Sequence, residues 1–412
     1  MIGVLRNPTY RSLFSAQVLA LLGTGLLTVA LGLLAYDLAG DKAGAVLGTA
    51  LTIKMVAYVG VAPLMAALVD RLPKKTVLVG ADLIRLAIAL SLPAVTETWQ
   101  IYILVFVLQS ASATFTPAFQ SLIPSVLPDS RDYTRALALS RLAYDLEALV
   151  SPVLAAALLA VITYNNLFIG TALGFACSAI LVVTATLPAR ESTTTSDTFW
   201  QRLPMGVRVF LRTPSLRFVM ATNLVVGAGT AIVLVNSVVY VKATFHYDDS
   251  AVALTLGAYG LGSLITAFSI PFLVERFGVI RTMVTGSFVI AAALALSVGV
   301  SGFFVSPAID WPVLLGVWLV MGVGTSLVNT PSSRLLAEAS TPQNRNLVYT
   351  AQFALSHACF LITYPVAGWL GAVSLFGAAV ALFLIAAVGC VAVSATAALV
   401  GRAHQQVGAD LL

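Results

Sequence analysis

Five ionisable side chains lie within long apolar stretches of this chain, where a charge is costly. They are Lys54, Arg141, Asp145, Glu147 and His357. A charged side chain near the centre of a bilayer costs about 2.5–3.5 kcal/mol on insertion scales, so each needs a partner or a path to water. A carboxylate in apolar surroundings can take up and release a proton near neutral pH. The set therefore predicts a proton-carrying site inside a membrane.

Both carboxylates belong to the stretch 136–162. Arg141 and Asp145 are four residues apart and can pair along one face of a helix. Glu147 follows two residues later, about 200° round the helix, so it faces elsewhere. We predict a proton-coupling site in which Arg141 anchors Asp145 and Glu147 carries the proton. An alternative stays open, in which Glu147 pairs with a charge such as Lys54 and only holds helices together.

Polar side chains in the other apolar stretches are candidates for lining a substrate cavity. Lys54 lies ten residues into its stretch, near mid-depth, with Tyr58 four residues on along the same face. His357 lies equally deep in a later stretch, with Tyr364 seven residues on. Such residues also serve as hydrogen-bonding contacts between helices. The remaining members of the predicted cavity are Gln109, Asn236, Asn329 and Gln352.

Charged residues also gather at the ends of the apolar stretches, on the side that the charge distribution places in the cytoplasm. We predict that they form a conformational latch of ion pairs that holds the molecule closed on one side. The predicted latch consists of Asp70, Arg71, Lys74, Lys75, Asp82, Arg85, Glu275 and Arg276.

The elements that must position these groups are membrane-spanning helices. The chain of 412 residues is 59% apolar and 9% charged, and its mean hydropathy is +0.98, whereas soluble domains are about 45–50% apolar and about 25% charged. A spanning helix needs about 20 mostly apolar residues. Twelve such stretches predict an all-α membrane protein with twelve transmembrane helices, at 13–38, 44–68, 76–95, 101–122, 136–162, 167–187, 216–241, 251–274, 282–303, 312–335, 347–371 and 374–400.

The basic residues predict the orientation of these helices. With the N-terminus inside, all but three of the 22 Lys and Arg fall in cytoplasmic segments or adjoining helix ends, the exceptions being Lys42, Lys54 and Lys242. The positive-inside rule then places both termini in the cytoplasm of a bacterial-type inner membrane. The net charge of +5 thus reflects topology, and no nucleic-acid partner is expected.

The chain repeats itself after six predicted helices. Asn7-Pro8-Thr9-Tyr10-Arg11 opens the first stretch and Thr213-Pro214-Ser215-Leu216-Arg217 opens the seventh. An even number of helices separates the copies, so both have the same orientation in the membrane. We predict two six-helix halves, 1–187 and 216–412, joined by a cytoplasmic linker at 188–215.

One segment resembles the major facilitator superfamily. The run Ala66-Ala67-Leu68-Val69-Asp70-Arg71-Leu72-Pro73-Lys74-Lys75 is similar to that family's signature between helices two and three, which has a glycine, a leucine, an Asp-Arg pair, a second glycine and a basic pair. The charges match, whereas Ala66 and Pro73 replace the two glycines. The resemblance implies that helices two and eleven meet, so that Lys54 and His357 share a cavity.

Other runs resemble the exporter branch that includes enterobactin exporters, macrolide efflux pumps and nickel-resistance permeases. They are Leu5 to Phe14 and Ala136 to Asp145, while Leu21-Leu22-Gly23-Thr24-Gly25 with Gln109 to Ala113 is most similar to the nickel group. That resemblance implies nickel or a related divalent cation as the first expected substrate, with His357 as the metal ligand. Cys359 is two residues from His357 and points to the opposite side of a helix, so it does not join the site. A siderophore or a lipophilic drug is the alternative substrate.

The sequence lacks the motifs of other function classes. It has no Walker loop, no HExxH and no GxSxG, so neither ATP-driven transport nor an enzyme is predicted, and no cofactor is expected. We expect a monomeric secondary active exporter that moves a small molecule or ion against protons by alternating access. A substrate-sensing receptor on a transporter fold is the alternative of another class.

Overall fold

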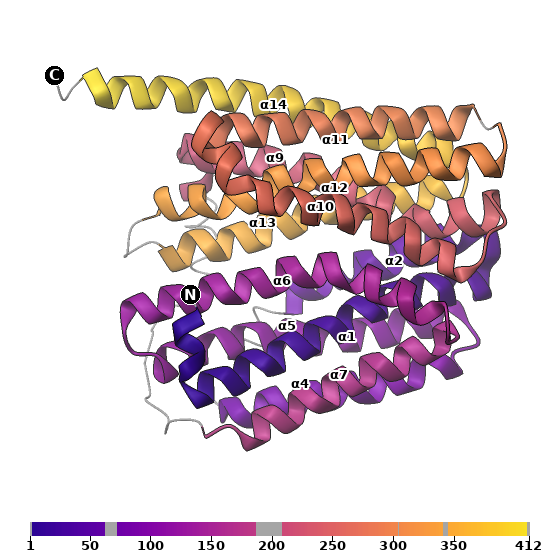
Figure 1. Ribbon diagram of the computed structural model, residues 1–412, viewed down its shortest axis with the longest axis horizontal. Helices are drawn as coiled ribbons and strands as arrows, with labels where there is room; N and C mark the ends of the chain where they lie inside the picture. Colours follow the sequence, from indigo (N-terminus) through magenta and orange to yellow (C-terminus); the bar gives the residue numbers. More distant parts are fainter. Residues whose placement is uncertain (1, 62–71, 187–207, 304, 341–344, 410–412) are drawn as a thin grey trace. The chain divides into compact units, whose positions relative to one another are not determined.

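The computed structural model describes residues 2–61, 72–186, 208–303, 305–340 and 345–409, and all regular structure within these ranges is helical (Figure 1). Some side chains inside the helices are not described, among them those of Arg141 and Asp145. Asp70 and Arg71 of the predicted latch also lie outside the described residues.

The helices follow one another with short connections. The earlier ones are η1 (Ile2–Arg6), α1 (Pro8–Ala39), η2 (Gly40–Lys42), α2 (Ala43–Val56), η3 (Ala57–Val61), α4 (Lys74–Ser91), η4 (Leu92–Ala94), α5 (Thr98–Val126), α6 (Ser130–Leu159) and α7 (Tyr164–Thr184). The later ones are α9 (Pro214–Ala231), η5 (Ile232–Asn236), η6 (Val239–Thr244), α10 (Asp249–Phe277), α11 (Val279–Gly302), α12 (Pro307–Glu338), α13 (Arg345–Pro365), η7 (Val366–Leu370) and α14 (Leu375–Ala409).

Ten runs in the described part of the chain are long and apolar enough to cross a membrane, which makes this a multi-pass membrane protein. The first run, Pro8–Val61, has 54 residues and contains two of the predicted spans. The predicted span at 136–162 falls on α6, whose described residues include the apolar stretch Val150–Leu159. Counting the first run as two and α6 as one recovers the twelve predicted helices.

The repeated sequence that opens each half begins a helix in both copies. Asn7 caps α1, because its side-chain oxygen accepts a hydrogen bond from the Tyr10 backbone N–H at 3.0 Å, and Pro8 follows at the first helical position. Thr213 and Pro214 occupy the equivalent positions at the start of α9. The repeated sequence therefore marks the start of a helix in both places.

The chain forms two compact units. The first contains Met1–Gly40, Ile53–Phe199 and Asp249–Leu254, and the second contains Asp41–Thr52, Trp200–Asp248 and Thr255–Leu412. The first turns of α2 thus belong to the second unit. The predicted linker at 188–215 lies mostly outside the described residues, so its limits stay a prediction.

Glycines bring the helices of the first unit together around α1. A β-carbon on Gly23 would lie 3.0 Å from the Thr171 carbonyl oxygen of α7, and one on Gly174 would lie 2.7 Å from the Leu19 carbonyl oxygen of α1. The Thr171 hydroxyl also donates to the Gly23 carbonyl at 2.9 Å. Real β-carbons do not approach this closely, so α1 and α7 pack backbone against backbone only because glycine is present.

Glycines also allow close helix packing in the second unit, beside the buried indole of Trp318. β-Carbons on Gly262 of α10 and Gly322 of α12 would overlap the backbone of the facing helix. Trp318 is fully buried beside this crossing, donates from Nε1 to the Ser237 hydroxyl at 2.7 Å, and meets the Tyr240 ring edge to face at 5.9 Å.

Candidate functional site

Glu147 lies where α6 crosses α1 in the first unit. The crossing is close because Gly25 of α1 has no side chain: a β-carbon there would lie 3.1 Å from Glu147 Oε1 and would overlap Ser151 one helical turn further along α6. The Glu147 side chain is half-buried. The proton carrier predicted from the sequence is therefore held against a neighbouring helix at mid-chain of α6.

Lys54, at the end of α2, is near this carboxylate. It is half-buried, and its charge interacts with that of Glu147. Its Nζ lies 6.0 Å from the centre of the Tyr58 ring, and Tyr58 also interacts electrostatically with Glu147. All three side chains are described, and no hydrogen bond joins Lys54 to Glu147. The Glu147 carboxylate therefore interacts with the Lys54 charge without a direct hydrogen bond to it.

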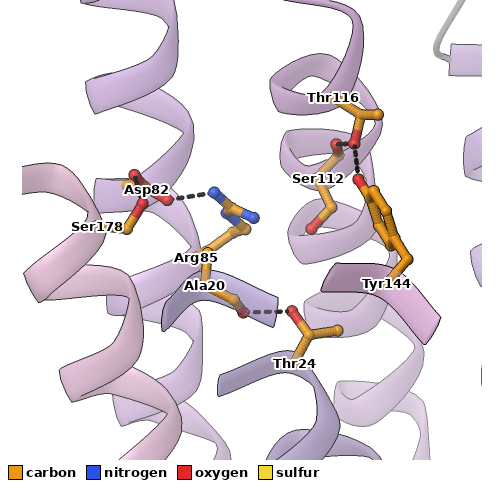
Figure 2. A network of polar contacts seen from close by, with 8 residues as sticks. All are labelled: Ala20, Thr24, Asp82, Arg85, Ser112, Thr116, Tyr144 and Ser178. Atoms are coloured by element: carbon orange, nitrogen blue, oxygen red, sulfur yellow. Dashed lines mark hydrogen bonds and ion pairs between the residues drawn. The ribbon is translucent and has the colours of Figure 1, made fainter. Parts of the chain in front are cut away.

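Asp82 and Arg85 form an ion pair in the interior of the same unit (Figure 2). They lie one turn apart on α4, with exposed fractions of 0% and 4%, and the Ser178 hydroxyl of α7 donates to Asp82 Oδ2 at 2.7 Å. The guanidinium carbon of Arg85 lies 4.4 Å from the centre of the Phe115 ring and 4.6 Å from that of Phe175. These contacts of the pair all lie within one unit, and its predicted part in a latch stays a prediction.

The other described members of the predicted latch lie at helix ends. Lys75 donates from Nζ to the Ala185 carbonyl at the end of α7, at 3.0 Å, and Lys74 at the start of α4 also has an interaction partner. Glu275 and Arg276 are exposed near the end of α10, where the Arg276 guanidinium lies 5.6 Å from the centre of the Phe277 ring.

Several buried polar atoms of α4 and α5 have no hydrogen-bond partner within the described part of the chain. They belong to Gln109 and Ser112 of α5 and to Nε of Arg85 itself, all buried. Beside them, the hydroxyls of Thr116 and Tyr144 lie 3.4 Å apart (Figure 2). Buried polar groups are normally satisfied, so each of these atoms is a candidate for binding water or a ligand.

Two residues on the Glu147 face of α6 were not predicted from the sequence. Tyr144 is three residues before Glu147 and Ser151 four residues after it, which are the spacings that put side chains on one helical face. Tyr144 interacts electrostatically with Tyr58 and Arg85. The spacing could have found both residues, but neither carries a charge that would have drawn attention to it.

The polar residues predicted in the second half lie within the second unit. Asn236 is fully buried and donates from Nδ2 to the Ala367 carbonyl at 3.0 Å, so it holds η5 to η7. Tyr364 stacks on Phe360 at 5.1 Å. Asn329 and Gln352 are half-buried, and Oε1 of Gln352 has no partner among the described residues.

His357 does not sit in a cluster of metal ligands. Its Nδ1–H donates to the Phe353 carbonyl one turn earlier, at 2.7 Å, and its ring packs on that of Phe353 at 4.1 Å. No group of three or more His, Cys, Asp or Glu side chains that could hold a metal occurs in the described part of the chain. The donor set around His357 therefore gives the nickel prediction no support.

Apolar helices in two compact units, with titratable groups buried among them in the first, are typical of a membrane transporter. The family model described as Major Facilitator Superfamily matches residues 13–240 and 219–408. The chain therefore belongs to the major facilitator superfamily, as its sequence predicted, and is a secondary transporter and not an enzyme.

Solved transporters share the fold at low sequence identity. The nucleoside transporter NupG, in a mutant form, superposes with a TM-score of 0.71 at 15% identity, covering 94% of this chain and 99% of that one. A bacterial homologue of the lysosomal transporter Spinster gives a TM-score of 0.68 at 12% identity over 95% of this chain and 97% of that one. At such identities the likeness shows the fold alone.

The sequence relatives include efflux proteins. Macrolide efflux protein A of Streptococcus pyogenes is 26% identical over 184 residues, which cover 43% of this chain and 45% of that protein. Macrolide efflux protein A of Enterococcus faecalis is 28% identical over 152 residues, 34% of this chain and 47% of that one. The chain thus matches less than half the length of these curated relatives. The similarity favours the drug alternative over nickel.

Proposed function

We propose that this transporter exports a lipophilic organic molecule of the macrolide type across the cytoplasmic membrane in exchange for protons. The similarity to macrolide efflux protein A supports the substrate class and the direction. The observation that carries the coupling is the position of Glu147, which is half-buried at a helix crossing, near the charge of Lys54 and not bonded to it.

The chemistry of coupling follows from these two charges. When Glu147 is ionised, its carboxylate attracts the Lys54 ammonium and draws α6 and the end of α2 together. When a proton from the outer side neutralises the carboxylate, this attraction is lost and Lys54 is released. Each protonation state thus favours a different arrangement of the helices, and the cycle of the two states drives alternating access.

The substrate surface would lie next to this pair. Tyr58 and Tyr144 are half-buried and offer aromatic faces, and the unsatisfied polar atoms of Gln109 and Ser112 offer hydrogen bonds. A large molecule that is mostly apolar and carries several hydroxyl and carbonyl groups fits such a lining.

The substrate class is tested by expression in a bacterial strain that lacks its own drug exporters. We expect raised resistance to macrolides, and the panel includes other lipophilic drugs, a siderophore, nickel and cobalt. Resistance to nickel or cobalt alone would contradict the macrolide proposal, and so would export of the siderophore without any drug.

The coupling is tested in proteoliposomes with radiolabelled erythromycin as the probe. Glu147→Gln should abolish uptake driven by a pH gradient and preserve exchange of erythromycin across the membrane without a gradient. Glu338→Gln makes the same chemical change at an exposed site on α12 and should behave as the unaltered chain. Gradient-driven uptake that survives in Glu147→Gln would remove this carboxylate from the coupling mechanism.

A further inference from the structure

The hydroxyl of Ser151 has no hydrogen-bond partner in the described part of the chain, although it is only 1% exposed. In a membrane helix a serine or threonine hydroxyl commonly donates to the carbonyl four residues earlier. On the facing helix α1, Thr24 and Thr28 do so, to the Ala20 and Thr24 carbonyls at 2.9 and 3.1 Å. Ser151 leaves the corresponding carbonyl, that of Glu147, without this bond.

The side chains of Ser151 and Glu147 meet at one point on α1. Both lie against Gly25, since a β-carbon on Gly25 would overlap Ser151 and would touch Glu147 Oε1 at 3.1 Å. The two oxygens are therefore a few ångströms apart. A serine side chain changes between staggered rotamers about a single bond, so a small rotation brings its hydroxyl to the carboxyl group.

The other titratable groups that the structure describes around Glu147 do not supply this bond. Lys54 from α2 and Tyr58 from η3 interact with Glu147 through their charges, and α1 contributes only uncharged residues at the crossing. The side chains of Arg141 and Asp145, also on α6, lie outside the described residues. Ser151 is a hydroxyl on the Glu147 face of α6, one turn from Glu147, and it is buried against α1 at Gly25.

We propose that Ser151 is a positioning residue that donates a hydrogen bond to a carboxyl oxygen of Glu147 and so holds it ready to exchange its proton. The hydroxyl keeps its own proton throughout: the proton that Glu147 gains comes from water, and the serine donates to the remaining carbonyl oxygen. Gly25 is the second part of this device, because any side chain there would push both groups away from α1. The inference rests on the proposed role of Glu147 in proton coupling.

The test is infrared difference spectroscopy of the purified full-length protein in lipid, between acid and alkaline pH. The carbonyl stretch of protonated Glu147 is identified as the band that disappears in Glu147→Gln. A hydrogen bond to a carbonyl lowers its stretching frequency, so Ser151→Ala should move this band to higher wavenumber. Ser151→Cys, which keeps a weaker donor of similar size, should give an intermediate position.

Two further measurements separate this inference from the proposed function. Gradient-driven erythromycin uptake should fall by roughly three- to ten-fold in Ser151→Ala, the equivalent of one hydrogen bond. Ser297→Ala removes a buried hydroxyl of α11 that already donates within its own helix, and it should leave both band and uptake unchanged. An unmoved band in Ser151→Ala overturns the positioning role even if uptake depends on Glu147. A shifted band without Glu147-dependent uptake overturns the proposed function and leaves the hydrogen bond standing.

Discussion

Removing the charge of Asp82 should destabilise the first unit strongly. Asp82 and Arg85 are almost fully buried, so water cannot replace the lost partner. Breaking a buried ion pair by removing one partner costs about 3–5 kcal/mol, because the other charge remains uncompensated. In Asp82→Asn the Arg85 guanidinium keeps its contacts with the rings of Phe115 and Phe175, each worth about 0.5–2 kcal/mol. We therefore expect a loss near the lower end of that range, about 3 kcal/mol.

The assay is the melting temperature of the purified protein in detergent, read as the fraction that stays monodisperse after heating. A loss of about 3 kcal/mol in a unit of this size corresponds to a fall of roughly 6–12 °C. The matched control is Asp132→Asn, since Asp132 and Arg135 form a pair with the same spacing at 3.0 Å but with exposed fractions of 40% and 53%. An exposed pair contributes about 0–1 kcal/mol, so the control should hardly melt earlier.

The double variant Asp82→Asn, Arg85→Met completes a double-mutant cycle for this ion pair. Removing both charges should recover most of the stability, because a buried pair replaced by uncharged residues is often neutral. If Asp82→Asn melts at the same temperature as Asp132→Asn, then losing Asp82 does not leave an uncompensated buried charge on Arg85, and the reasoning is wrong. If it melts normally but stops transport, the latch predicted from the sequence becomes the better account of Asp82.

Two other substitutions test the packing of the second unit. Gly48→Val should cost about 1–3 kcal/mol and slow transport, because a β-carbon at Gly48 would lie 2.7 Å from the Gly368 Cα and 2.9 Å from the Tyr364 carbonyl oxygen. Gly316→Ala, where nothing lies within 4 Å, is its control, and equal melting and transport rates in the two variants would contradict the reasoning. Trp318→Phe removes the hydrogen bond from Nε1 to the Ser237 hydroxyl and should lower stability by about 1–2 kcal/mol, measured as melting temperature. A melting temperature equal to that of the unaltered protein would show that this buried bond contributes nothing net.

Much of the fold could be predicted from the sequence because lipid acts on each segment separately. The run that contains α11 is apolar over its whole length and crosses the membrane whatever its neighbours are. The helix start at Asn7-Pro8 was equally readable, since a cap and a proline act within one turn. The π-helical turns η3, η5, η6 and η7 were not predicted, because they shift backbone hydrogen bonds in response to packing and leave no composition signal.

The candidate site likewise has features that the sequence predicts and features that only the structure shows. The cost of burying a charge singles out Glu147 and Lys54 in the sequence, but their nearness depends on how α2 and α6 are brought together in the bundle. The spacing of Asp82 and Arg85 predicts that they can pair along one helix, but only the structure surrounds the pair with Ser178 and two phenylalanine rings from other helices. Their part in a latch stays a prediction.

By itself the sequence determined that this protein spans the membrane many times, and it predicted two similar halves with a few titratable groups in the interior. Those properties follow from local hydropathy, helix capping and charge distribution, which act over one segment at a time. Only the tertiary structure decided which of these groups meet. The Glu147 carboxylate and the Ser151 hydroxyl reach the same point on α1 because Gly25, more than a hundred residues earlier in the chain, leaves the space they occupy. Such a contact depends on the approach of two helices, and no property of either helix alone reveals it.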